Sequence, residues 1–213
     1  MVDIIESRED AIASYPYDSL EEGFGLVTYY LYASEDSASK EYRIGKDLDY
    51  SAEVGILKDD GGGPSTNTTT FYSGTFARPR TINGTVKFNF CTQGQEHGGG
   101  DNYYFEIKFY HYDGTTSTQL GSTWTSATDQ MVSSPGQIMV FNGDINISSK
   151  KFRAGDQMKI EVILQSNFTA GTPHSVLEYG IDPQNRDGVR IKPSTDNEAF
   201  TQFIVRVPFR LVN

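Results

Sequence analysis

The sequence predicts an all-β protein, an antiparallel β-sandwich of about eight strands that each bury one face. Two observations lead to this prediction. In Lys151–Gln165, apolar and polar residues alternate with the period of a half-buried strand, and Met158, Ile160, Val162 and Leu164 share one face. The chain also combines 13 Tyr and 13 Phe with 21 Gly. Aromatic residues favour strands and Gly favours turns, so many strands joined by loops are expected.

Other strands are expected wherever apolar residues alternate or run together. They are Leu26–Tyr32, Val54–Ile56, Phe71–Phe76, Val86–Phe90, Tyr103–Tyr112, Ile138–Phe141 and Thr201–Leu211. Residues 59–70, DDGGGPSTNTTT, predict a flexible loop, and Asn83-Gly84 predicts a tight turn. Pro208 has no backbone N–H to donate, so the last strand is expected at a sheet edge or at a bulge.

Residues 1–18 are expected to form an N-terminal arm, and residues 19–213 a single β-sandwich domain. Within the arm, Asp3–Ser14 places Ile4, Ile5 and Ile12 roughly on one side of a short amphipathic helix. This apolar side gains little in water, so we expect it to be buried against a neighbouring subunit. A frayed terminus, or a segment that folds back on its own domain, is the alternative.

The charge of the chain and the length of its apolar segments argue against two classes of partner, nucleic acid and membranes. The net charge is −10, and Lys and Arg are scattered along the sequence. Nucleic acid would be repelled rather than attracted, so no nucleic-acid partner is expected. The first residues, MVDIIESRED, are acidic and have no apolar core of a signal peptide, and the apolar run LVTYYLY is only as long as a strand. We therefore expect neither secretion nor a membrane partner.

Few residues are arranged for chemistry. Asp182, Asn185 and Asp187, in the segment DPQNRDG, are candidate calcium ligands, although their spacing does not follow the EF-hand pattern. The alternative is a surface turn in which Asp and Asn side chains cap the backbone. The three His residues show no metal-binding spacing, and neither Cys91 nor any Ser has the sequence context of a nucleophile. We therefore expect no cofactor and no enzymatic activity.

One strand face carries a candidate interaction surface. Tyr104, Tyr110 and Tyr112 share the outward face of the strand Tyr103–Tyr112 with Glu106 and Lys108. Tyrosines on an outward face are typical of subunit interfaces, of strands covered by a second element, and of the flat sheet faces that bind carbohydrate. The subunit interface is the preferred interpretation.

Four segments, in this order, resemble β-sandwich virion proteins of tailed viruses, particularly environmental and archaeal ones. The segments are RPRTINGTVKFNF, FRAGDQMKIEVIL, DPQNRDG and the terminal VPFRL. The resemblance implies a jelly-roll-like, non-enzymatic head-decoration or tail component that assembles as a symmetric oligomer with other virion proteins. It also implies assembly in the host cytoplasm. The alternative is a carbohydrate-binding or receptor-binding β-sandwich module whose partner is a host-surface glycan.

Overall fold

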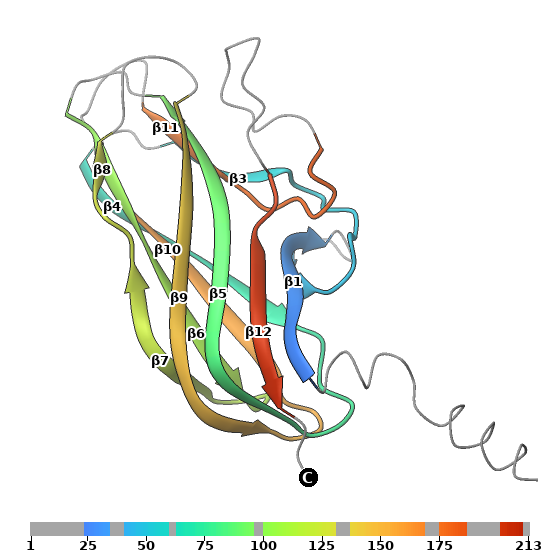
Figure 1. Ribbon diagram of the computed structural model, residues 1–213. Coiled ribbons are helices and arrows are strands. Elements are labelled where there is room, and N and C mark those ends of the chain that lie inside the picture. Colours follow the sequence, from blue (N-terminus) through green and yellow to red (C-terminus); the bar gives the residue numbers. More distant parts are fainter. Residues whose placement is uncertain are drawn as a thin grey trace, which may run out of the picture.

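The computed structural model describes residues 24–34, 41–59, 63–95, 100–130, 137–168, 175–186 and 201–210. Within these ranges the regular structure consists of strands, with no helix (Figure 1). The strands are β1 (Phe24–Ser34), β2 (Glu41–Gly45), β3 (Gly55–Asp59), β4 (Gly63–Ser73), β5 (Arg80–Gln95), β6 (Asn102–Tyr112), β7 (Ser117–Thr125), β8 (Asp129–Gln130), β9 (Gln137–Phe152), β10 (Gln157–Phe168), β11 (Val176–Gly180) and β12 (Ile204–Arg210). The predicted all-β class is confirmed. The predicted arm lies outside the described residues, so the division at residue 18 stays a prediction.

Hydrogen bonds join the twelve strands into one sheet. The sequence predicts about eight strands in total, divided between two packed sheets. The order of the single sheet is β3-β11-β5-β12-β1-β2-β4-β10-β6-β7, with β9 also paired to β5 and β8 to β6. Strand β1 makes the sheet continuous, because its first half pairs with β12 and its second half with β2. The pairing of β2 with β4 is parallel, and the other ladders are antiparallel.

The sheet folds back on itself, so that strands without mutual hydrogen bonds share one core (Figure 1). Aromatic rings connect the facing strands. Phe90 of β5 lies edge-on to Phe105 of β6, with ring centroids 5.0 Å apart, and Phe105 lies 5.3 Å from Phe141 of β9. Phe88 of β5 meets Trp124 of β7 in the same way at 5.0 Å. These edge-to-face contacts add to the free energy of burying the rings.

The strand on which the prediction relies most lies at the centre of one half of the sheet. β10 pairs with β4 on one side and with β6 on the other. Met158, Ile160, Val162 and Leu164 are all buried, as the alternation predicts. Ile163, on the opposite face, is also buried, at 6% exposure, so the outer face is partly covered at this point.

Two predicted breaks in the chain are instead strand. The predicted loop at residues 59–70 forms much of β4, because its threonines tolerate an extended backbone and pair with β10. Asn83-Gly84 makes no hairpin turn. Gly84 has a φ of 123° and lies at a shift of the ladder between β5 and β9, which is a β-bulge. The sequence correctly predicts a positive φ at this position, but the predicted tight turn is wrong, because Gly84 lies in a β-bulge.

Pro208 also lies at a bulge. β12 is a central strand between β5 and β1, so the predicted sheet edge is wrong. The ladder with β5 shifts between Arg206 and Phe209, which accommodates the missing N–H of Pro208 and confirms the alternative. A Cβ at position 84 would lie 3.4 Å from the ring of Pro208, an ordinary van der Waals contact, so a side chain there would be disfavoured by the positive φ rather than by a clash.

The turn between β9 and β10 holds a buried pair. His111 Nε2 lies 2.6 Å from Asp156 Oδ2, which also accepts a hydrogen bond from the Arg153 backbone N–H at 2.7 Å. Burial raises the pKa of the Asp156 carboxyl, but the hydrogen bonds from His111 and Arg153 outweigh it and hold the pKa below its usual value. The charged carboxylate therefore fixes the turn to β6.

This pair predicts a pH-dependent loss of stability. Because the folded-state pKa is depressed, the contribution of Asp156 is present above its unfolded pKa of about 3.9 and is lost as the pH falls through the folded value. Asp156→Asn should lower the free energy of unfolding by about 1–3 kcal/mol at pH 7. Melting curves from pH 7 down to about 2 should show the two proteins converging below about pH 4. Asp144→Asn, at an exposed position of β9, is the control. A gap that stays constant with pH would contradict this account.

Candidate functional site

The outer face of β4, β10 and β6 presents its side chains in registered rows across the three strands. Tyr110, Lys159 and Tyr72 form one row, and Tyr104, Gln165 and Thr66 form another six residues along β6. Tyr104, Tyr110 and Tyr112 are all half-buried on this face, where the period of two predicts them. We call this surface the outer tyrosine face.

Hydrogen bonds order the centre of the outer tyrosine face. The Tyr110 hydroxyl donates to Glu161 Oε2 at 2.7 Å, and Lys159 Nζ lies 2.8 Å from Glu161 Oε1 and 4.8 Å from the centroid of the Tyr110 ring. Burial, followed by the hydrogen bond to Glu161, raises the pKa of Tyr110. Burial raises the pKa of Glu161 too, but the hydrogen bonds from Lys159 and Tyr110 bring it below its usual value. The phenol is therefore neutral and the carboxylate charged at neutral pH.

Two hollows lie toward the ends of this face. One of about 420 Å³ is lined by Tyr72, Tyr112 and Gln157, and the two tyrosine rings meet edge-on at 5.3 Å. The other, of about 350 Å³, is lined by Tyr104 and by hydroxyl and amide side chains such as Gln165. The face thus offers aromatic surface beside neutral hydrogen-bonding groups.

The candidate calcium segment is a turn closed by the protein's own donors. Asp182 is fully buried, and its carboxylate accepts hydrogen bonds from Gln184 N at 3.2 Å, Arg186 N at 2.8 Å and Arg186 Nε at 2.9 Å. Asn185 has a φ of 51°, and its side-chain oxygen accepts from the Thr201 backbone N–H at 2.8 Å. Asp187, the third candidate, lies outside the described residues. The two visible candidates therefore cap a turn and hold it to the segment before β12.

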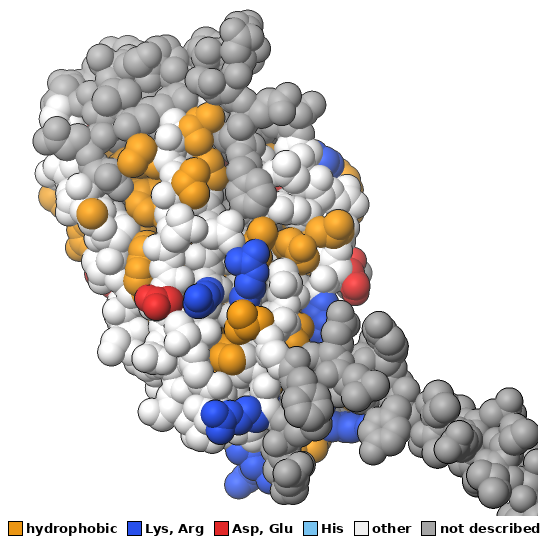
Figure 2. Space-filling model, in the orientation of Figure 1, with side chains coloured by type: hydrophobic (Ala, Val, Ile, Leu, Met, Phe, Trp, Pro, Cys, Tyr) orange, Lys and Arg blue, Asp and Glu red, His pale blue; other side chains and the backbone are white. Residues whose placement is uncertain are grey.

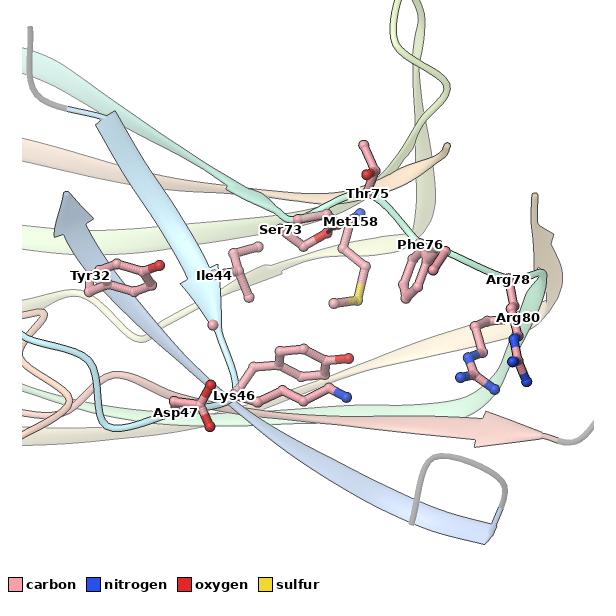
Figure 3. A pocket seen from close by; sticks show the side chains of 14 residues that line it. Tyr32, Ile44, Lys46, Asp47, Ser73, Thr75, Phe76, Arg78, Arg80 and Met158 are labelled. Carbon is pink, nitrogen blue, oxygen red and sulfur yellow. Dashed lines mark hydrogen bonds between the residues drawn. The ribbon is translucent and has the colours of Figure 1, made fainter. Parts of the chain in front are cut away.

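Sequence reasoning missed a cleft at one end of the molecule, at the junction of β1, β2 and the loop between β4 and β5. Its volume is about 580 Å³. Figure 3 shows Ile44, Phe76 and Met158 in its interior and Lys46, Arg78 and Arg80 along its rim. We call it the end cleft. Burial raises the pKa of the Tyr29 phenol in its wall, and the positive charge of Arg80 opposes that rise.

The end cleft lies in a cation-rich end of the molecule. Arg80 pairs with Phe152, and Thr81 pairs with both Lys151 and Arg210, so the β9 and β12 ends bring further cations beside the loop before β5. Figure 2 shows Lys and Arg side chains gathered at this end. Lys46, Arg78 and Arg80 line the cleft, Lys150, Lys151 and Arg210 pair with Ile82 and Thr81 at the start of β5, and Arg153 follows in the turn after β9. The fold thus gathers cations that are scattered in the sequence.

The other sequence candidates are not brought together. Ile4, Ile5 and Ile12 lie outside the described residues, as do His97 and His174. Cys91 is buried in β5. Within the described ranges, no cluster of three His, Cys, Asp or Glu side chains is placed to hold a metal ion, and no helix long and apolar enough to cross a bilayer occurs.

No protein-family model matches the chain, and no curated protein matches its sequence. Several solved structures are similar to it. An aminopeptidase from a marine sediment Thaumarchaeota archaeon matches 86% of this chain with 37% of its own, at 8% identity and a TM-score of 0.49. An α-amino acid ester hydrolase matches 85% with 36% of its own, at 10% identity and a TM-score of 0.47. The Gt strain of infectious bursal disease virus matches 87% with 36% of its own, at 10% identity and a TM-score of 0.30. The chain spans little more than a third of each.

These matches correct one prediction. The sequence-based expectation that the chain is not an enzyme is contradicted, because the aminopeptidase and the ester hydrolase are hydrolases. That expectation is not carried forward.

The hydrogen bonds of Asp182 predict that the turn is structural. Asp182→Ala would leave Arg186 Nε and two backbone N–H groups without their acceptor, and should lower the free energy of unfolding by about 1–3 kcal/mol. Arg186→Gln, the matched variant, should reproduce part of this loss. Calcium and a chelator should each leave the melting temperature of the unmodified protein unchanged. A rise of several degrees with calcium would instead identify a cation site.

Proposed function

We propose that the chain is a structural component of a virion, a head-decoration or tail protein that assembles as a homo-oligomer. The segments that resemble virion proteins supply the framework of the fold. RPRTINGTVKFNF leads into and forms the first part of β5, FRAGDQMKIEVIL spans the turn into β10, and VPFRL ends the chain's last strand. The all-β fold supports the proposal, under which the protein is assembled into the virion in the host cytoplasm.

The observation that carries the assembly part of this proposal is the outer tyrosine face. Tyr is enriched at protein interfaces, since it presents a large, rigid ring with a polar tip. Here three tyrosines of β6 and Tyr72 of β4 stand on one surface in registered rows, and Tyr110 is already held in place by Glu161. Because these side chains are ordered, docking a second subunit costs less conformational entropy. Other virion proteins are the further partners that we propose.

A second candidate function is recognition of a host-surface glycan on the same face. The observation in its favour is the mixture of groups around Tyr104: Gln165, Asn102 and Asn167 lie in the adjacent registered positions. Amides donate and accept hydrogen bonds, and an aromatic ring covers the C–H face of a sugar. Lys and Glu, which are depleted at protein interfaces, also occupy this face.

The assembly proposal predicts that the N-terminal arm is needed for the oligomer. Deletion of residues 1–14 should leave a protein with a near-native melting curve that no longer assembles. The reason is that the three isoleucines, each contributing about 1.5–3 kcal/mol when buried, would lose their partner surface on the next subunit. Mass measurement in solution and co-purification with particles are the readouts. A truncated chain that unfolds, or that assembles normally, would count against an arm that joins subunits.

The outer tyrosine face predicts different results for its two candidate partners. Tyr104→Ala combined with Tyr112→Ala should dissociate the oligomer if the face is a subunit interface. If the face binds a glycan, the double variant should keep its mass and lose its signal on a glycan array. Tyr30→Ala, on the outer side of β1, is the matched control for loss of a half-buried tyrosine. An unchanged mass together with unchanged glycan binding would remove this face from the proposal.

A further inference from the structure

The end cleft combines positive charge with an apolar interior. Lys46, Arg78 and Arg80 stand at its rim together with the carboxylate Asp47, and Asp49 lies beside the lining residue Tyr32. Arg78 is exposed and Arg80 is half-buried, in a chain whose net charge is −10. A cleft of this kind attracts negative charge by long-range electrostatics, and its low-dielectric walls strengthen the attraction. The occupant is therefore expected to be acidic.

The interior of the end cleft is lined by apolar side chains, so its occupant is expected to carry apolar groups as well as acidic ones. Ile44, Phe76 and Met158 line it, and Phe76 is braced edge-on against Phe152 at 5.4 Å and Phe209 at 5.9 Å. Met adapts to side chains of different shape. The volume of about 580 Å³ is enough for several aliphatic side chains. Ile44 and Met158 are already buried at the floor of the cleft, and a purely polar anion would leave the half-buried ring of Phe76 uncovered.

The N-terminal arm has the complementary composition. Asp3–Ser14 contains four acids, Asp3, Glu6, Glu9 and Asp10, and one base, Arg8, so its formal charge is −3. The isoleucines adjoin the acids, as in the run Asp3-Ile4-Ile5-Glu6. One short segment therefore carries both the charge and the apolar side chains that the end cleft would cover.

The geometry points to the end cleft as the docking site for residues 3–14 of a second copy of the chain. This inference rests on the proposed assembly function and names the surface that would receive the arm. Ten residue steps separate Ser14 from Phe24, where β1 begins, which allows a reach of roughly 35 Å. That is enough for the arm to leave its own subunit and enter a neighbour. In this docking the isoleucines lie against Phe76, and the acids face Arg78 and Arg80.

A charge exchange in the full-length chain tests this docking. One variant carries Glu9→Lys and Asp10→Lys in the arm, and the other carries Arg78→Glu and Arg80→Glu in the end cleft. Each variant alone should assemble at least tenfold more weakly than the unmodified protein. An equimolar mixture should recover assembly, because each altered arm meets an altered cleft and each natural arm a natural cleft. Sedimentation velocity measures the masses, and melting curves check that each variant is folded.

The control is Lys87→Glu with Arg206→Glu, a neighbouring pair on the outer side of β5 and β12 that makes the same change in charge away from the cleft. It should assemble normally. If the cleft double variant does not fold, Arg78→Gln alone, at an exposed position, should still weaken assembly measurably.

Three results would overturn the inference, and a fourth would also refute the proposed assembly function. Normal assembly of both charge variants would exclude the end cleft as the docking site. Weak assembly that mixing does not recover would mean that the arm does not enter a neighbour's cleft, and loss of assembly in the control would reduce the effect to net charge. In those cases the proposed oligomer would survive, with another interface. A monomeric unmodified protein at every concentration would refute the assembly proposal itself.

Discussion

The structure depends on the divided pairing of β1. Its first half is hydrogen-bonded to β12 and its second half to β2, so one strand belongs to both halves of the folded sheet. Without it, side-chain packing such as the aromatic contacts of β5 with β6, of β9 with β6 and of β5 with β7 would have to hold the halves together. Because β2 is short and meets β4 in parallel over only two registered residue pairs, the sheet is thin at this corner. The end cleft lies there, since little backbone is present to fill the space.

Much of the fold follows from alternation alone, and its failures have physical causes. β6 and β10 bury every second residue over their length, so their faces could be assigned without a structure. In β7 only Leu120 is buried, and β4 consists mostly of Ser, Thr and other small or polar residues, so neither strand produces a strong apolar period. Such strands form because their neighbours offer hydrogen bonds, a reason that lies outside their own residues. The same dependence explains Gly84, where a conformation common in turns serves a bulge.

The candidate sites divide in the same way. The outer tyrosine face could be predicted because Tyr104, Tyr110 and Tyr112 belong to one strand with one period. The nature of the Asp182 turn could not, because Thr201, which completes it, lies sixteen residues beyond Asn185. The end cleft could not be predicted from the sequence, because Lys46 and Arg80 are far apart along the chain and are brought together only by the fold at the corner near β1. The only sequence feature that pointed to the cleft was the pair of arginines on either side of Pro79. The sequence does not indicate which strands this loop lies beside.

The cation-rich end has a consequence for how copies of the molecule meet. Over the described residues, Lys and Arg are as numerous as Asp and Glu, so with seven cations gathered at one end the acids dominate over the rest of this part of the protein, which therefore carries an electric dipole. Two such molecules approaching in dilute salt rotate before they touch, and head-to-tail encounters become more frequent than random collision allows. At physiological ionic strength, fields decay within about 8 Å, so this alignment acts only in the last moments of approach. The speed of association, more than the final affinity, would then vary with salt concentration.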